Sequence, residues 1–340
     1  MEARIRGDAP VDDEVGLLDR LTAVRSALES EIGRRVIGQH EIVEGLLTAL
    51  LADGHALLVG VPGLAKTLLV STLAEALDLR FSRIQFTPDL MPTDITGTEV
   101  LEEDRSTGKR LFRFVRGPVF ANVILADEIN RTPPKTQAAL LQAMQERAVT
   151  AAGETMTLDR PFFVLATQNP IEQEGTYPLP EAQLDRFMLE LRIGYPTRAE
   201  EERIAMETTG AEESEIRPVV DAEELLRLQK LVRRVPAPPS LVSLAVRLAR
   251  STRPDDDESP EMTRRYVSWG AGPRASQYLV LGAKARAAMA GRGVPNFDDV
   301  RAIAPAVLRH RVVTNFQAEA DGRTTGDLVD ELIQASRKWT

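Results

Sequence analysis

The stretch that most constrains this chain is residues 56–67, which read ALLVGVPGLAKT. Four mostly apolar residues suit a buried strand, a glycine-rich turn follows, and Lys66 and Thr67 then open a predicted helix. Backbone N–H groups in such a turn and at a helix N-terminus point at anionic oxygens, and the helix dipole favours negative charge there. An ordinary corner between a strand and a helix is the alternative. We interpret the segment as a phosphate-binding loop.

This interpretation gives individual residues a role. Lys66 is expected to reach the β- and γ-phosphates of a nucleotide, and the Thr67 hydroxyl is expected to bind Mg²⁺. The usual pattern has glycine directly before the lysine, whereas this chain has Ala65. Alanine costs little at a negative φ angle, so we predict a negative φ for Ala65. The expected nucleotide-binding residues of the loop are Gly60, Val61, Pro62, Gly63, Leu64, Ala65, Lys66, Thr67 and Leu68.

A second motif, ANVILADE at residues 121–128, is an apolar strand that ends in two carboxylates. Asp127 can hold the Mg²⁺ shell directly or through water, because Mg²⁺ takes hard oxygen ligands and retains several waters. Glu128 points elsewhere and could polarise a water aimed at the γ-phosphate. Adjacent acids also begin solvated loops or cap helices. Together, the two motifs predict a nucleotide-hydrolysis site within an α/β sheet.

Two further segments end in polar residues. Residues 160–169, RPFFVLATQN, form a buried strand whose final Asn169 could hold the attacking water or sense the γ-phosphate. The alternative for Asn169 is a turn that begins at Asn169–Pro170. Residues 178–187, PLPEAQLDRF, contain Arg186, a candidate arginine finger for charge on the transferring phosphoryl group. The alternative is a surface pair of Asp185 and Arg186, which would contribute little.

With these motifs the chain resembles the AAA+ ATPases and, among them, the MoxR family. The resemblance is carried, from about residue 30 to 280, by VIGQ (36–39), GVPGLAKT (60–67), FTPDLMPTDITG (86–97), RGPVF (116–120), LADEINR (125–131), ATQNP (166–170), LPEAQLDRF (179–187) and GPRAS (272–276). Alanine at position 65 is what this family shows, so it does not count against nucleotide binding.

The resemblance implies a role for each matching residue. It assigns Lys66 and Thr67 to Walker A, Asp127 and Glu128 to Walker B, Asn169 to sensor 1, Arg186 to the finger supplied to a neighbouring subunit, Arg274 to sensor 2, and Val36 and Ile37 to the adenine pocket. Arg274 opens a predicted helix, where the dipole disfavours a cation, so an anionic partner is expected. From there Arg274 could reach the phosphates of a nucleotide lying between two domains, and the lid angle would depend on what is bound.

The order of elements predicts a P-loop AAA+ fold of the α/β class. We expect an N-terminal helical segment (1–35), a nucleotide-binding α/β core (36–195) with a parallel five-stranded sheet flanked by helices, and a C-terminal all-helical lid (196–340). The expected strands are 56–59, 79–85, 119–126, 162–167 and 187–193. The expected helices are 13–35, 40–52, 222–235, 240–251, 274–291, 297–313 and 325–338, with capped helix starts at Thr197 and Asp221.

Residues 98–115 and 145–158 interrupt the alternation of strands and helices in the α/β core and are predicted to form β-hairpins. Two decorative surface hairpins are one interpretation. Their positions match the helix-2 insert and the pre-sensor-1 hairpin of related machines, where such loops line a central channel. The first hairpin is locally basic through Lys109, Arg110, Arg113 and Arg116, and a solvated charged surface explains these charges more economically than a nucleic-acid contact.

Composition restricts the function classes. A net charge of −9 argues against broad binding to nucleic acid. The chain has no cysteine, and its three dispersed histidines offer no metal cluster. The most apolar window, residues 46–60, is too short to cross a bilayer, and the N-terminus lacks the apolar stretch of a signal peptide. We therefore expect a cytoplasmic protein without a membrane span.

These observations predict an ATPase that binds ATP or ADP with Mg²⁺ and works as a homo-oligomeric ring, most simply a hexamer. The resemblance implies chaperone-like remodelling, maturation or metal insertion of a client protein complex, with a von Willebrand factor A-domain protein as partner. Two alternatives remain open: the motor subunit of a chelatase-type or rubisco-activase-type machine, and a slow nucleotide-gated binding switch. No feature of the sequence identifies the client.

Overall fold

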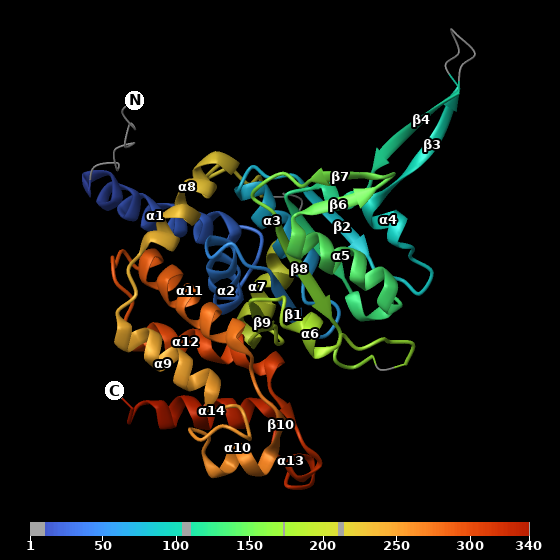
Figure 1. The fold of residues 1–340 in the computed structure, drawn as a ribbon. Coiled ribbons are helices and arrows are strands. Elements are labelled where there is room, and N and C mark those ends of the chain that lie inside the picture. The colour runs from blue at the N-terminus through green and yellow to red at the C-terminus, as the bar shows by residue number, and fades with distance from the viewer. Residues whose placement is uncertain (1–10, 104–109, 173, 210–213, 340) are drawn as a thin grey trace, which may run out of the picture.

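The computed structural model describes residues 11–103, 110–172, 174–209 and 214–339. A five-stranded parallel sheet in the order β2-β5-β8-β1-β9 organises the N-terminal half (Figure 1). Its strands are β2 (Phe81–Gln85), β5 (Val123–Asp127), β8 (Phe163–Gln168), β1 (Ala56–Val59) and β9 (Leu189–Arg192). The parallel five-stranded sheet is confirmed.

The three central strands of this sheet, β5, β8 and β1, alternate between two buried faces. Leu58, Leu125 and Leu165 pack on one face, against helices α1 (Val11–Ile32), α2 (His40–Leu51), α3 (Lys66–Ala76) and the C-terminal helices. Leu57, Ile124 and Val164 pack on the other face, against α4 (Pro92–Thr96) and α5 (Pro134–Glu146). Near-continuous apolar strands are expected when a parallel sheet is covered on both faces.

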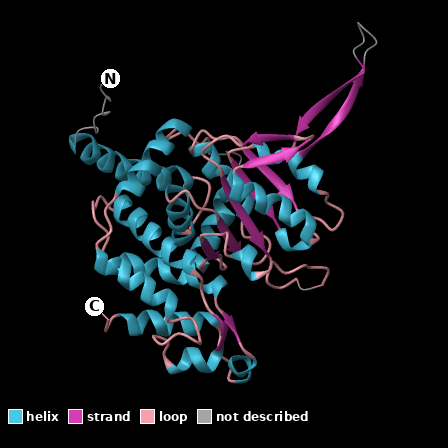
Figure 2. Ribbon diagram, viewed as in Figure 1, coloured by secondary structure: helices cyan, strands magenta, loops and turns pink. Residues whose placement is uncertain are grey.

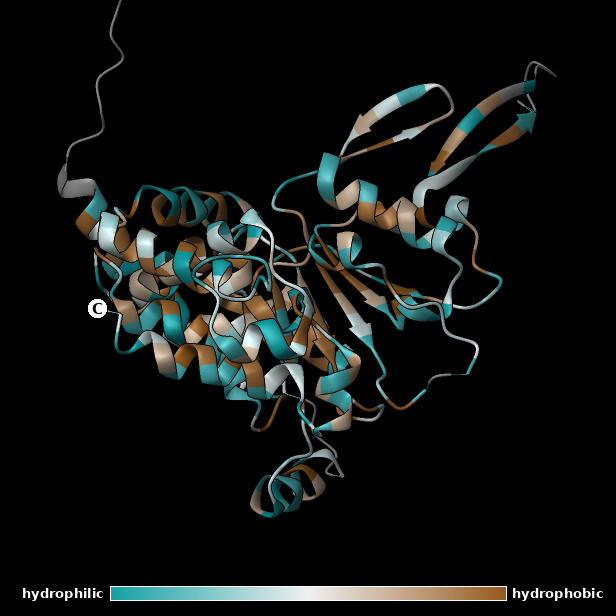
Figure 3. Ribbon diagram, turned by 60° about the horizontal axis from the view of Figure 1, so that its bottom comes forward, coloured by the Kyte–Doolittle hydropathy of each residue, from teal (hydrophilic) through white to brown (hydrophobic). Residues whose placement is uncertain are grey.

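Two hairpins leave the sheet end of the molecule side by side and point away from the helical part (Figure 3). Strands β3 (Gly97–Glu103) and β4 (Arg110–Arg116) pair in register, as do β6 (Ala148–Ala151) and β7 (Glu154–Thr157). Both predicted hairpins are confirmed, although the predicted turn at 106–108, together with Lys109, lies outside the described residues. Arg110 and Arg113 face Glu103 and Glu102 across the first hairpin, so acidic neighbours offset part of its basic charge.

The C-terminal part is predominantly helical (Figure 2). Its elements are α7 (Arg198–Thr208), α8 (Ala222–Arg234), α9 (Pro239–Arg250), α10 (Glu261–Tyr266), α11 (Pro273–Met289), α12 (Phe297–Leu308), α13 (Phe316–Ala320) and α14 (Thr325–Ser336). Thr197 forms a capping box with Glu200, and the Asp221 side chain accepts from the backbone N–H of Glu224. Both predicted helix starts are therefore confirmed. Helix α1 packs against α3, α8 and α11, and so contacts both halves of the chain.

The sequence-based expectation misses several short elements. Residues 119–126 were predicted as one strand, but a 3-10 turn, η1 (Pro118–Phe120), precedes β5. The lid was predicted to be entirely helical, but β10 (Val267–Trp269) pairs with β11 (Val313–Thr314). The 3-10 turn η3 (Arg309–Arg311) ends the helix that begins at Phe297. The short α6 (Glu181–Leu184) precedes β9. Elements of two to four residues are too short to show a period.

Candidate nucleotide-hydrolysis site

The predicted phosphate loop joins the end of β1 to the start of α3. The backbone N–H of Gly60 donates to Gln168 O on the neighbouring strand at 3.1 Å. A Cβ at position 60 would lie 2.2 Å from Cγ2 and 2.7 Å from the carbonyl oxygen of Ile193. Only glycine therefore lets the loop start this close to the chain that follows β9. Gly63 has a φ of +83°, a conformation that glycine adopts without strain.

Ala65 is the N-cap of α3 and has a φ of 52°, in the left-handed region. The prediction of a negative φ at this position is wrong. The conformation costs an alanine about 1–2 kcal/mol, and the loop carries this strain. Alanine has no side-chain oxygen to bind the N–H groups of the first helical turn, and that turn contains no acidic residue. These N–H groups therefore face no competing acceptor from the cap residue.

Lys66 begins α3, and its ammonium group turns back across the loop to donate to Gly60 O at 2.5 Å. Burial lowers the pKa of Lys66, while the nearby carboxylates of Asp127 and Glu128 raise it. Lys66 follows β1 and Asp127 ends β5, so both lie at the carboxyl ends of the parallel strands of one sheet. The structure thus brings together Lys66, Asp127 and Glu128, as the motifs predict.

Thr167, to which the motifs assign no role, connects the two acids. Its hydroxyl donates to Asp127 Oδ1 at 2.7 Å and accepts from the backbone N–H of Glu128 at 2.8 Å. The side chain is fully buried on β8, which lies between β5 and β1. The available signal was a hydroxyl near the end of an otherwise apolar strand.

Two side chains from β2 also hold the acids. Arg83 donates to Asp127 Oδ2 at 2.6 Å, and Gln85 donates to Glu128 Oε2 at 3.2 Å. Arg131 binds the same Glu128 oxygen at 3.0 Å. Arg83 and Gln85 flank Ile84 on the edge strand, so they project to the same side. The alternation of polar and apolar residues in β2 is the sequence signal for this shared side, although the motifs do not include Arg83 or Gln85.

Asn169 is buried at the end of β8, between the strands that carry the loop and the acids. Its Oδ1 accepts from the backbone N–H of Ile171 at 3.2 Å. The turn considered as an alternative is therefore present. The amide nitrogen of Asn169 is a donor separate from the oxygen that forms the turn, so the turn and a contact to phosphate are compatible.

A cavity of about 130 Å³ adjoins the phosphate loop. Val36 and Ile37 line it, as predicted for an adenine pocket. The rest of its wall is mostly apolar, and it is formed by Arg35, Gln39, Gly63, Leu64, Ala65, Leu68, Leu69, Ile193, Pro196, Ile204 and Thr208. An apolar cleft beside a phosphate loop suits a flat base.

Arg186 and Arg274 lie together, but they do not lie at the loop. Both line a second cavity, of about 270 Å³, whose wall includes Asp53 and His55. Asp53 and His55 precede β1, so this cavity is at the amino ends of the parallel strands. Lys66 and Asp127 are at the carboxyl ends. A single chain therefore does not bring Arg274 to its own phosphate loop, contrary to the expectation for a nucleotide held between its two domains.

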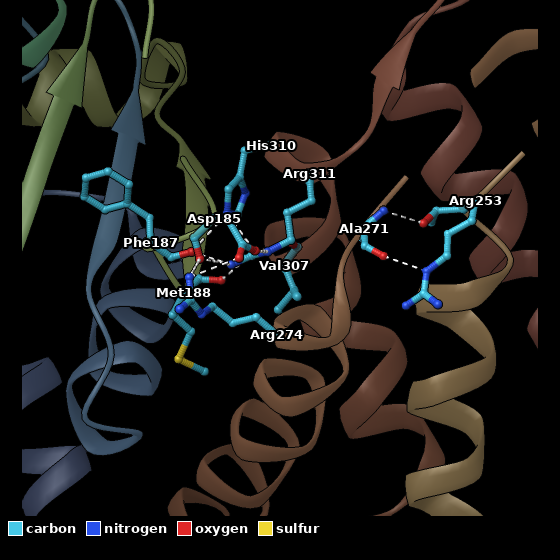
Figure 4. Close-up of polar contacts among 10 residues, drawn as sticks. Asp185, Phe187, Met188, Arg253, Ala271, Arg274, Val307, His310 and Arg311 are labelled. Carbon is cyan, nitrogen blue, oxygen red and sulfur yellow. Dashed lines mark hydrogen bonds and ion pairs between the residues drawn. The ribbon is translucent and has the colours of Figure 1, made fainter. Parts of the chain in front are cut away.

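The position of Arg274 is set by contacts between the lid and the segment before β9 (Figure 4). Arg274 donates to Asp185 Oδ2 at 3.1 Å, and Arg311 donates to Asp185 Oδ1 at 2.8 Å. Arg311 also donates to the carbonyl oxygens of Phe187 at 2.6 Å and Met188 at 3.3 Å. Burial lowers the pKa of Arg311, whereas the hydrogen bond to Asp185 raises it. The lid is thereby fixed to the residues beside Arg186.

The protein ligands available for Mg²⁺ fit this ion only if phosphate oxygens complete its coordination shell. No group of three or more His, Cys, Asp or Glu side chains that could hold a metal occurs in the described ranges. Thr67 and Asp127 supply a hydroxyl and a carboxylate, which are hard ligands, and Mg²⁺ is commonly held by one or two protein ligands plus substrate phosphates.

Within the described part of the chain, no helix is long and apolar enough to cross a bilayer.

Comparison with known proteins shows which family the chain resembles. Residues 55–189 match the model of the ATPase family associated with various cellular activities (AAA), and residues 260–332 match an AAA lid domain. Chaperone MoxR1 of Mycobacterium tuberculosis is 42% identical over 327 residues, which cover 96% of this chain and 85% of the relative. Protein MoxR of Methylorubrum extorquens is 32% identical and covers 90% of this chain and 92% of the relative.

A solved structure gives the same result for the fold. The crystal structure of a candidate ATPase from Cytophaga hutchinsonii is 39% identical, with a TM-score of 0.85, over 93% of this chain and 96% of that one. Identity and coverage at this level extend through both the sheet and the lid. The chain belongs to the MoxR family of AAA ATPases.

Proposed function

We propose that this ATPase hydrolyses Mg-ATP at sites formed between neighbouring subunits of a homo-oligomeric ring, most simply a hexamer. The observation that carries the proposal is the separation of the phosphate loop from Arg186 and Arg274, which lie at opposite ends of the sheet. In a head-to-tail ring, each interface brings the arginine edge of one subunit, which carries Arg186 and Arg274, to the loop edge of the next, which carries residues 60–67. Closure of the ring then completes every site.

One subunit supplies the binding half of the site. Backbone N–H groups of Gly60–Thr67 and the Lys66 ammonium hold the triphosphate, with the base in the cavity beside Val36 and Ile37. Thr67 and Asp127 hold Mg²⁺, which neutralises phosphate charge when bound. Glu128 orients the attacking water and accepts its proton, while Asn169 contacts the γ-phosphate or that water.

The neighbouring subunit supplies the arginines. Arg186 and Arg274 stabilise the charge that develops on the transferring phosphoryl group. Arginine suits this role because its planar guanidinium stays charged and binds phosphate oxygens in pairs. We therefore propose that both Arg274 and Arg186 act on the neighbour's nucleotide.

We propose that ATP hydrolysis drives chaperone-like remodelling or maturation of a client protein complex. The support is the name of the relative Chaperone MoxR1 together with the projecting β3–β4 hairpin. Leu101 and Phe112 on that hairpin are 52% and 72% exposed, and exposed apolar groups of this kind suit contact with another protein. A von Willebrand factor A-domain protein is the proposed partner.

Two alternatives predict different behaviour. A chelatase-type or rubisco-activase-type motor would raise its turnover with its own client. A slow binding switch would show low turnover that no client increases. Steady-state ATP hydrolysis with and without a candidate client separates the motor from the switch. The Glu128→Gln variant held with ATP is the suitable bait for finding such a client.

Mixing two inactive variants tests the split site. Lys66→Ala removes the loop lysine and leaves the arginine edge intact, whereas Arg186→Ala does the reverse. In a random equimolar mixture, about a quarter of the sites have an intact loop facing an intact arginine edge, so about a quarter of wild-type turnover should return.

A matched control pairs two defects on the same edge. Lys66→Ala mixed with Glu128→Gln should stay inactive, because no interface then has an intact loop edge. Failure of the Lys66→Ala and Arg186→Ala mixture to recover, with mixed oligomers verified by light scattering and pull-down of tagged subunits, would refute the split site.

A further inference from the structure

We infer that Arg147 is a third arginine that each subunit presents to its neighbour's triphosphate, beside Arg186 and Arg274. The inference rests on the proposed function, because it requires the arginine edge to face a nucleotide. Arg147 lines the same cavity of about 270 Å³ as the other two arginines, and its side chain is 28% exposed. It follows directly after α5, an element separate from those that supply Arg186 and Arg274.

The backbone of Arg147 is held in place. The residue is the C-cap of α5 with a φ of 52°, and its N–H donates to Ala143 O at 2.9 Å. Its carbonyl accepts from the N–H of Leu158, also at 2.9 Å. A long side chain on a fixed backbone can change its contact without moving the helix.

Asp53 neutralises only part of the positive charge of Arg147, because other arginines share the same carboxylate. The Asp53 side chain is 7% exposed, and its Oδ2 lies 2.7 Å from Arg147, 2.8 Å from Arg160 and 3.6 Å from Arg233. One carboxylate cannot neutralise three guanidinium groups, so this cluster carries excess positive charge. Electrostatic attraction for an anion is the consequence.

The remaining cavity residues do not offset this excess. Arg186 and Arg274 add two positive charges, and Asp185 is already shared by Arg274 and Arg311. His55 adds no charge, because burial lowers its pKa to about 4. An anion with several charges, such as a triphosphate, fits this environment better than a single carboxylate does.

The Arg147 guanidinium can move away from Asp53 without leaving that carboxylate unpaired. Arg160 and Arg233 remain on the same carboxylate when the Arg147 guanidinium turns to a phosphate, so a buried carboxylate is not left unpaired. Losing the last partner of a buried charge would be costly, whereas exchanging one of three is not. Arg147 is therefore the member of the cluster that can contact a ligand, because it alone of the three lines the cavity.

The position of Arg147 also links the nucleotide to a hairpin. The residue directly precedes β6, the first strand of the second hairpin. A contact between Arg147 and the neighbour's phosphates would fix the base of this hairpin, and loss of the γ-phosphate would release it. The hairpin of one subunit would thus respond to the nucleotide state of the next.

The test compares Arg147→Ala with Arg160→Ala, a matched variant that removes another arginine from the same carboxylate. We expect Arg147→Ala to lower turnover at least about tenfold, the effect of losing one charge-assisted contact, with no change in melting temperature or oligomer size. Arg160→Ala should retain wild-type turnover. Arg147→Lys should recover part of the loss, since it keeps the charge but not the planar donor pair.

Mixing two variants shows whether Arg147 acts on the nucleotide of its own subunit or on that of the neighbouring subunit. Arg147→Ala mixed with Lys66→Ala should regain turnover, because the lysine variant presents an intact Arg147 to an intact loop. If the Arg186→Ala mixture recovers and the Arg147→Ala mixture does not, this inference fails while the proposed function stands. If neither mixture recovers, the split site itself fails. Equal loss of turnover in Arg147→Ala and Arg160→Ala would show a structural role for the cluster and would also overturn the inference.

Discussion

The Thr167 hydroxyl donates a hydrogen bond to Asp127 Oδ1 over 2.7 Å. Because the same hydroxyl accepts from the N–H of Glu128, one buried side chain fixes both acids of the proposed site. Glu128 itself has a φ of 57°, so the chain turns sharply between the two carboxylates. Thr167 is thus a positioning residue: it acts through Asp127 and Glu128.

Thr167→Val should lower the rate of ATP hydrolysis about tenfold while the protein stays folded. Valine matches the shape of threonine but leaves the Glu128 N–H and the Asp127 oxygen without their partner, at a cost of about 1–3 kcal/mol. Steady-state turnover against Mg²⁺ concentration measures this, and the half-saturating Mg²⁺ concentration should rise. Thr167→Ser keeps the hydroxyl and should behave like the wild type. Equal rates for the valine and serine variants would contradict the role.

Arg311→Ala should destabilise the contact between the lid and β9. Its guanidinium is almost fully buried and binds Asp185, Phe187 O and Met188 O, so its removal takes three hydrogen bonds from the contact between the lid and β9. Losing these hydrogen bonds, one of them to a charged group, should cost about 2–4 kcal/mol, while Arg274 still pairs with Asp185.

Arg309→Ala is the matched control for Arg311→Ala. Arg309 lies 3.9 Å from Asp330, a 60% exposed carboxylate, and such a pair contributes about 1 kcal/mol or less. Thermal melting of both variants tests the difference. Similar melting temperatures for the two would show that Arg311 does not fix the lid.

Acidification should destabilise the protein through His55. Its Nδ1 accepts from the N–H of Val164 at 3.1 Å, so the buried ring is neutral, and burial lowers its pKa from 6.5 to about 4. Between these values the unfolded chain binds more protons than the folded one. The free energy of unfolding should therefore fall by about 3 kcal/mol as the pH drops from about 6.5 to 4.

His55→Asn isolates this contribution. Asparagine keeps an acceptor for the Val164 N–H but does not titrate. His310, whose pKa is also lowered by burial, changes stability in the same direction in both proteins and cancels in the comparison. Denaturant unfolding at a series of pH values should give a flatter profile for the variant. Parallel profiles would mean that His55 is not held neutral.

Ala65→Gly should stabilise the nucleotide-free protein by about 0.5–1 kcal/mol. Glycine relieves the left-handed strain at φ 52°, and this gain exceeds the entropy that glycine loses on folding. Ala205→Gly, at an exposed position inside α7, should instead destabilise by about 1 kcal/mol. Differential scanning calorimetry distinguishes the two. A loss of stability in Ala65→Gly would contradict the strain.

Contiguous motifs explain what could be predicted from the sequence. The stretch from Ala56 to Thr67 contains its own strand, turn and helix start, so neighbours in the chain are also neighbours in space. Asp127 and Glu128 could be placed beside the loop because parallel strands bring their carboxyl ends to one edge. The order of apolar runs therefore predicted both the sheet and its acidic edge.

Features that depend on packing could not be predicted. The φ of Ala65 is set by the three-dimensional path of the loop, and the motif alone gave the wrong sign. The location of Arg274 depends on where the lid docks, and Arg311, 37 residues later in the chain, sets this through Asp185. Arg147 gave no sequence signal, because it lines a cavity that forms only where α5, the segment before β9 and α11 meet in the folded chain.

The most direct test of the account is calorimetric titration with a nonhydrolysable ATP analogue and Mg²⁺. The account predicts saturable heat at one analogue per chain, its loss in Lys66→Ala, and its retention in Lys135→Ala, where an exposed lysine far from the loop in sequence is removed. No heat at millimolar analogue, or unchanged binding in Lys66→Ala, would contradict the claim that the loop at 60–67 holds the nucleotide.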